Sequence, residues 1–235
     1  MDEGQARTDA EVFDIAREPS MRPENFFVSN ANRTAFELIA DPESWPKRKL
    51  AIVGEACSGK THLAIIWAHR AGAQIVPARQ LDSVEIRAMG NLPGVAVDDS
   101  DAVSGSGALE EALLRLHNVV AECGGHLLLT ARAVPSRWNI ALPDLKSRLA
   151  ATYVVSLGKP DDELLEALLI KHFSDRQIFV ARGTITYILN RIERSCQAVQ
   201  SVVAALDKLS LGRGRPLTRA VASELLSEAG QSGLA

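Results

Sequence analysis

Short apolar runs alternate with stretches of helical periodicity over the first two thirds of the chain. The runs predict five strands, at residues 49–53, 75–76, 95–97, 127–130 and 153–155. Between them, apolar residues recur at helical spacing over 61–71 and 109–121, and a further helix from Ala31 should end at Asp41, just before Pro42. Continuous apolar strands separated by helices predict a parallel sheet covered by helices on both faces.

The pattern changes after Leu157, where helical periodicity continues without further strands. The residues predict three helices, at 163–173, 184–192 and 198–211. The first 24 residues carry many charges and little periodicity. We therefore expect three parts: a flexible N-terminal tail over 1–24, an α/β base domain over 25–157 and a small all-helical domain over 158–235.

Composition and charge narrow the class of protein. With 46% hydrophobic and 23% charged residues, the chain is typical of a globular protein. Its net charge of -3 provides no general attraction for nucleic acid, so direct sequence-specific DNA binding is not expected. The cysteines Cys57, Cys123 and Cys196 are widely spaced, which suits a reducing compartment. Without a long apolar run or a secretory start, we expect a cytoplasmic protein with no membrane partner.

A glycine-bounded loop follows the first predicted strand and opens the next helix. It reads Gly54-Glu55-Ala56-Cys57-Ser58-Gly59-Lys60-Thr61 and fits the P-loop pattern G-x-x-x-x-G-K-[ST] at every position. Glycines allow a tight turn in which successive N–H groups face phosphate oxygens, and the helix N-terminus adds positive potential. Lys60 is expected to reach the phosphates and Thr61 to bind magnesium through its hydroxyl. The loop predicts a site for ADP or ATP with Mg²⁺.

Two further groups could complete the chemistry of such a site. Asp98 and Asp99 end an apolar strand downstream of the loop, where Asp98 is expected to hold the metal, largely through water, and Asp99 to act as general base. Acidic residues also end strands simply as turn formers. Arg148 follows the fourth strand and could meet a phosphate, or only cap a helix or pair with a surface acid.

These blocks together resemble the bacterial DnaA-related AAA+ family. The matching blocks, in the family's order, are Asn25–Arg33, Gly54–Leu63, Asp98-Asp99, Leu128–Thr130 and Ser147–Leu149. The resemblance runs from about residue 24 to 227 and implies an AAA+ fold, in which nucleotide lies between an α/β base and a helical lid. It also implies that Phe27, Val28 and His62 help to bind the nucleotide. Arg148 matches the family's arginine finger, which completes a neighbouring subunit's site, so a homo-oligomer is one expected assembly.

The sequence departs from the family's pattern at three places. Aligning Ala205-Leu206 with the lid motif places Gln200 where the family has a sensor arginine, and a glutamine brings no charge to the nucleotide. Arg132 stands where the initiator has an acidic residue. The stretch at 10–15 keeps Phe13 and Ile15 of a clamp-binding peptide but lacks its glutamine.

Three functions are compatible with these residues. The chain stops just after the expected lid, as Hda-like regulators of this family do, which predicts a regulator of replication initiation that offers Arg148 to ATP-loaded DnaA while its tail binds the DNA polymerase sliding clamp. An autonomous AAA+ ATPase, or a loader of another replication or DNA-processing protein, is the alternative, although Gln200 counts against it. A filament that grips single-stranded DNA is a third, which the acidic balance opposes.

Overall fold

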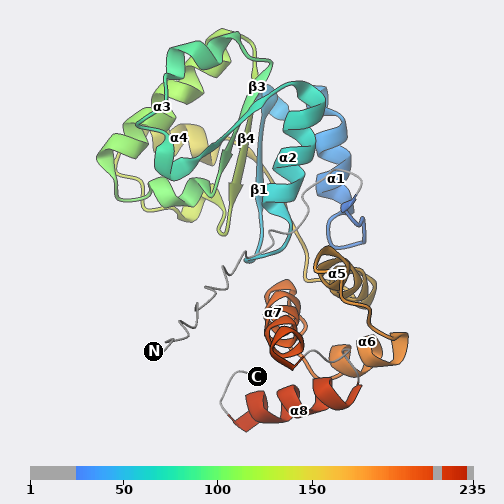
Figure 1. Ribbon diagram of the computed structural model, residues 1–235. Coiled ribbons are helices and arrows are strands. Elements are labelled where there is room, and N and C mark those ends of the chain that lie inside the picture. Colours follow the sequence, from blue (N-terminus) through green and yellow to red (C-terminus); the bar gives the residue numbers. More distant parts are fainter. Residues whose placement is uncertain (1–24, 214–218, 232–235) are drawn as a thin grey trace, which may run out of the picture.

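The computed structural model describes residues 25–213 and 219–231 and shows a parallel sheet flanked by helices with a helical lid beneath it (Figure 1). The sheet has the strand order β2-β3-β4-β1-β5, and every pair is parallel. Its strands are β1 (Lys49–Val53), β2 (Gln74–Pro77), β3 (Gly94–Asp98), β4 (His126–Ala131) and β5 (Tyr153–Ser156). The predicted parallel sheet and its five strands are confirmed.

Helices cover both faces of the sheet, so successive residues of one strand enter different cores. α1 (Arg33–Ala40) and α2 (Lys60–Ala71) pack on one face, and α3 (Gly107–Glu122) and α4 (Pro143–Ala150) on the other (Figure 1). In β1, Leu50 and Ile52 join the core beneath α1 and α2, whereas Ala51 and Val53 join the core beneath α3. Burial on both faces explains why the strands appear as unbroken apolar runs.

Short turns of 3-10 helix connect these elements. They are η2 (Pro42–Ser44), η3 (Pro46–Arg48), η4 (Ala78–Gln80), η5 (Ile86–Asn91), η6 (Ser100–Val103) and η7 (Pro135–Arg137). None of the described helices is long and apolar enough to cross a membrane.

The described chain after β5 forms a helical lid with its own core. Its helices are α5 (Asp162–Asp175), α6 (Arg182–Leu189), α7 (Cys196–Arg213) and α8 (Arg219–Gln231). Leu169, Phe173 and Val203 are among the buried residues of this core. The three predicted helices correspond to α5, α6 and α7, and the prediction missed α8, from which Ala222 is buried and Val221 and Leu226 pack against the lid core.

Two sequence predictions lie outside the described residues: the flexible tail over 1–24, and the clamp-binding residues Phe13 and Ile15 within it.

A fully buried carboxylate ties α3 to the loop before α4. Glu110 accepts hydrogen bonds from the backbone N–H groups of Gly105, Ala141 and Leu142 at 3.2, 2.9 and 3.0 Å. A buried ionised group is tolerated when hydrogen bonds replace its hydration, and these three bonds also satisfy donors that water does not reach. Glu110 thereby helps to position α4.

Glu110→Ala should therefore lower the free energy of unfolding by about 3 kcal/mol or more, because it leaves buried N–H groups unpaired. Glu110→Gln, which keeps one acceptor oxygen, should cost less. Urea unfolding followed by circular dichroism measures both, with exposed Glu111→Ala as the matched control. Equal midpoints for Glu110→Ala and Glu111→Ala would contradict this account.

A buried histidine should make the stability depend on pH. The pKa of His117 is lowered from 6.5 to about 4, chiefly by burial and also by the nearby charges of Lys49 and Arg148, while Asp144 acts in the opposite direction. The unfolded chain then binds more protons than the folded one between pH 6.5 and about 4, so stability should fall as the pH drops through this window. His172, whose pKa is also about 4, adds a second such contribution.

His117→Gln should flatten this pH dependence in part, leaving the share of His172. Urea midpoints at pH 7, 6, 5 and 4.5 provide the measurement, and exposed His69→Gln serves as the control. An undiminished loss of stability in His117→Gln would show that this imidazole is not the responsible group.

Candidate nucleotide-binding site

The loop between β1 and α2 is a tight turn that depends on its glycines. A Cβ at Gly54 would lie 2.9 Å from Ser58 Oγ and 3.1 Å from the Cβ of Leu157. Gly59 has φ +95° and Cys57 has φ +60°, both in the left-handed region. Such a turn brings the loop backbone back over the start of α2.

Hydrogen-bond donors gather inside this turn. The first N–H groups of α2 have no partner within the helix, and its N-cap Gly59 has no side chain to cap them. Ser58 Oγ is buried without a hydrogen-bond partner among the described residues. Lys60 Nζ lies across the loop and donates to the carbonyl of Glu55 at 2.7 Å. These donors suit a phosphate group.

The electrostatic surroundings of Lys60 also suit an anion. Burial lowers the pKa of Lys60, while the carboxylates of Asp99 and Asp98 raise it and Arg132 lowers it. A phosphate beside the ammonium would offset the cost of burying its charge. The predicted phosphate-binding residues of the loop are therefore close together and chemically matched.

Two threonines, one on α2 and one on β4, hold the carboxylate at the end of β3. Thr61 Oγ1 donates to the carboxylate of Asp98 at 3.0–3.1 Å, and Thr130 Oγ1 donates to Asp98 Oδ1 at 2.6 Å. Thr130 Oγ1 also accepts a hydrogen bond from the N–H of Asp99 at 3.0 Å. Asp99 has φ +51°, and its side chain is exposed beside the loop. The structure thus brings together Thr61, Asp98 and Asp99, as the sequence analysis expected.

This oxygen set could hold magnesium only together with a nucleotide. Among the described residues, no cluster of three or more His, Cys, Asp or Glu side chains is arranged to bind a metal ion. Mg²⁺ is commonly held by one or two protein oxygens, with phosphates and water completing its octahedron. Thr61 and Asp98 are the residues that would supply the protein oxygens here.

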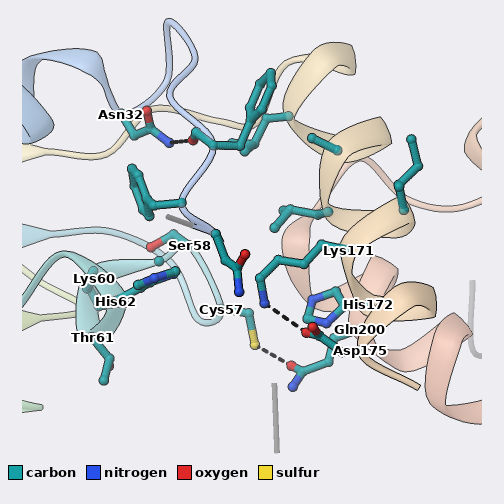
Figure 2. A pocket seen from close by; sticks show the side chains of 18 of the residues that line it. Asn32, Cys57, Ser58, Lys60, Thr61, His62, Lys171, His172, Asp175 and Gln200 are labelled. Atoms are coloured by element: carbon teal, nitrogen blue, oxygen red, sulfur yellow. Dashed lines mark hydrogen bonds and ion pairs between the residues drawn. The ribbon is translucent and has the colours of Figure 1, made fainter. Parts of the chain in front are cut away.

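A cavity of about 630 Å³ lies between the loop and the lid and is lined by residues of both (Figure 2). Its size is within the usual range for small-molecule sites. Gln200 on α7 accepts a hydrogen bond from Cys57 Sγ at 2.8 Å, so the lid contacts the loop directly. The sequence-predicted residues that line the cavity are Phe27, Cys57, Ser58, Gly59, Lys60, Thr61, His62 and Gln200.

Aromatic side chains line another part of the cavity. Phe26 stacks on Phe36 with centroids 5.7 Å apart and meets the ring of His62 edge-on at 5.1 Å. Phe27 is 42% exposed, which is unusual for so large an apolar side chain. Such a surface suits a purine base. The predicted residues Val28, Gly54, Glu55 and Ala56 are not among the described residues that line the cavity.

Arg148 lies at the other end of the sheet. Its charge acts on Lys49, the first residue of β1, whereas the loop follows Val53 at the opposite end of the same strand. Four residue steps along a parallel strand span about 13 Å. The structure therefore does not bring Arg148 to the site that its own loop forms.

Several residues at the loop and the cavity were not recognised from the sequence. Thr130 was visible only as part of a family block, and its role follows from β4 lying between β1 and β3. Lys171, His172 and Asp175 on α5 also line the cavity. Asp175 follows Lys171 by four residues and His172 by three, so these side chains share one side of α5. No local sequence pattern shows that this side of the helix meets the loop.

Comparisons with known proteins place the fold. No family model matches the sequence. An uncharacterized protein of Haemophilus influenzae is 27% identical over 213 residues, covering 87% of this chain and 92% of that protein. Domain III of the Thermotoga maritima replication initiation protein DnaA has a TM-score of 0.74 at 18% identity, covering 90% of this chain and 97% of that one. AMPPCP-bound DnaA from Aquifex aeolicus has a TM-score of 0.65 at 16% identity, covering 84% and 69%.

These likenesses concern the fold alone: the five-stranded parallel sheet flanked by helices matches the P-loop AAA+ fold of the DnaA structures. The predicted fold class is confirmed.

Lys60→Ala should weaken binding of Mg–ADP by about a hundredfold, because it removes a charge-assisted contact in a partly buried site. The unfolding free energy without nucleotide should change little, since the buried ammonium has an unfavourable environment. Isothermal titration calorimetry measures the affinity, and exposed Lys146→Ala is the control. Unchanged affinity in Lys60→Ala would rule out the loop as a phosphate site.

Proposed function

We propose that this chain is a nucleotide-binding regulator of DNA replication initiation, of the Hda type within the DnaA-related AAA+ family. Its loop holds ADP or ATP with Mg²⁺, using Lys60 for phosphate and Thr61 with Asp98 for the metal. The nucleotide stabilises the arrangement of base and lid. The regulatory act is to present Arg148 to the nucleotide site of ATP-loaded DnaA.

The position of Arg148 is the observation that carries this proposal. Its side chain lies at the end of the sheet away from its own loop and is 36% exposed. Asp144, one helical turn earlier on α4, holds the Arg148 Nε at 3.0 Å. An arginine held in this way can reach another subunit's phosphates but not its own. A guanidinium that stabilises charge in a partner's transition state acts in this geometry.

The residues at the chain's own nucleotide favour binding over rapid hydrolysis. Gln200 faces the loop with an uncharged amide where the family has an arginine, and so adds no positive charge to a phosphate. Asp99 is placed to orient a water as general base. The cation that would stabilise charge in the transition state would have to come from a neighbouring subunit. Slow hydrolysis by the isolated protein follows.

The partners rest on the family resemblance. DnaA supplies the ATP whose hydrolysis is stimulated, and the sliding clamp brings this chain to DNA through its tail, with Phe13 and Ile15 as the contact residues. Arg148 could also complete the site of another copy of this chain. The tail carries no glutamine at the expected position, so we expect clamp binding to be weaker than that of a complete motif.

An autonomous ATPase or loader is the second candidate, favoured by one specific observation. The carboxylate of Asp98 is already held by Thr61 and Thr130, and Asp99 lies beside Lys60. A complete set of metal and base residues is present. Hydrolysis by the protein alone, lost in Asp99→Asn, would support this candidate.

The decisive experiment measures ATP hydrolysis by DnaA from the same source, with and without this protein and DNA-loaded clamp. Wild type should stimulate hydrolysis, and Arg148→Ala should remove most of the stimulation, since losing a finger lowers the rate by a factor of about 10³ or more. Arg137→Ala, which changes another exposed arginine of the same domain, is the control.

Retained binding of Mg–ADP by Arg148→Ala would show that its own site is intact. A wild-type protein that binds nucleotide but gives no stimulation would rule out the regulator and leave the autonomous ATPase to be tested.

A further inference from the structure

One face of α5 lines the cavity from the lid side and changes character along its length. Leu164, Leu168, Lys171 and Asp175 recur at spacings of four, three and four residues, and all four border the cavity. The opposite face is anchored in the lid core by buried residues such as Leu169. The face of α5 that borders the cavity is therefore apolar at its start and charged at its end.

Lys171 is directed from the lid toward the loop. Figure 2 shows its side chain leaving α5 and reaching toward Cys57, close to Gln200. Its Nζ forms an ion pair with Asp175 Oδ2 at 2.9 Å, and the two side chains are only 18% and 15% exposed. A pair so enclosed is screened less by solvent than a surface pair.

Few positively charged side chains line the cavity, and Lys171 is one of them. Of the described residues that line it, Lys60 and Lys171 are the only lysines or arginines, and Asp175 is the only acid. Nucleotide phosphates carry several negative charges, and Lys60 alone supplies one positive charge from the base. Gln200, the neighbouring lid residue at the loop, supplies none.

We propose that Lys171 is the lid's cation for the nucleotide phosphates, exchanging its ion pair with Asp175 for a phosphate contact and supplying the charge that Gln200 lacks. This inference rests on the proposed nucleotide site and assigns a specificity-determining residue within it. Asp175 acts as the competing counter-ion: it holds Lys171 at the cavity and opposes phosphate with its own charge. Base and lid then each contribute one lysine.

The test is isothermal titration calorimetry of the full chain with Mg–ADP and, separately, with adenosine. Lys171→Met keeps the apolar stem of the side chain and removes its charge. It should raise the Kd for ADP about tenfold, the effect of losing a charge-assisted hydrogen bond, and leave the Kd for adenosine unchanged. Asp175→Asn should lower the Kd for ADP, because it removes the competing charge. Lys208→Met, which changes an exposed lid lysine, should match wild type.

Specific outcomes would overturn the inference. An unchanged ADP affinity in Lys171→Met would show that the ammonium contacts no phosphate. Equal weakening of ADP and adenosine would show that Lys171 only shapes the lid, and weaker ADP binding in Asp175→Asn would show that the ion pair itself is needed. ADP binding that is lost in Lys60→Ala but unaffected in Lys171→Met would overturn this inference alone. No ADP binding by wild type would overturn the proposed nucleotide site as well.

Discussion

The carboxylate of Asp98 joins three elements that are far apart in the sequence. It ends β3, accepts a hydrogen bond from Thr61 on α2 and another from Thr130 on β4. Because β4 lies between β1 and β3, the loop after β1 and the acids after β3 are separated by one strand, and the hydroxyl of Thr130 bridges this separation. The position of any metal beside a bound phosphate depends on this arrangement.

The lid makes the second contact on which the site depends. The thiol of Cys57 donates to Gln200, so the loop and α7 are joined by a weak hydrogen bond between uncharged groups. The charges of the lid lie instead on α5, where Lys171 and Asp175 neutralise each other. A cavity between two separately packed bodies, each with its own core, can adjust its width with little cost to either core.

The two ends of the sheet have different properties. The carboxyl ends of the strands carry the loop and the acids, as in other α/β proteins whose ligands bind there. The amino ends carry Arg148 together with Lys49 and His117. Burial, and after it the charge of Arg148, lowers the pKa of both Lys49 and His117. These side chains therefore lie at the end of β1 opposite the chain's own loop.

Most of the fold and the loop could be read from the sequence. Strands buried on both faces leave unbroken apolar runs, and the loop leaves a contiguous motif, because each is a local demand of the backbone. The helix α8 was missed, although its Val221 and Leu226 pack against the lid core together with the buried Ala222. Only the tertiary structure decided which residues lie together: the hydrogen bond of Thr130 to Asp98, the position of Lys171 at the cavity and the distance of Arg148 from its own loop follow from strand order and lid placement. These are set by packing between distant segments, which no local pattern records.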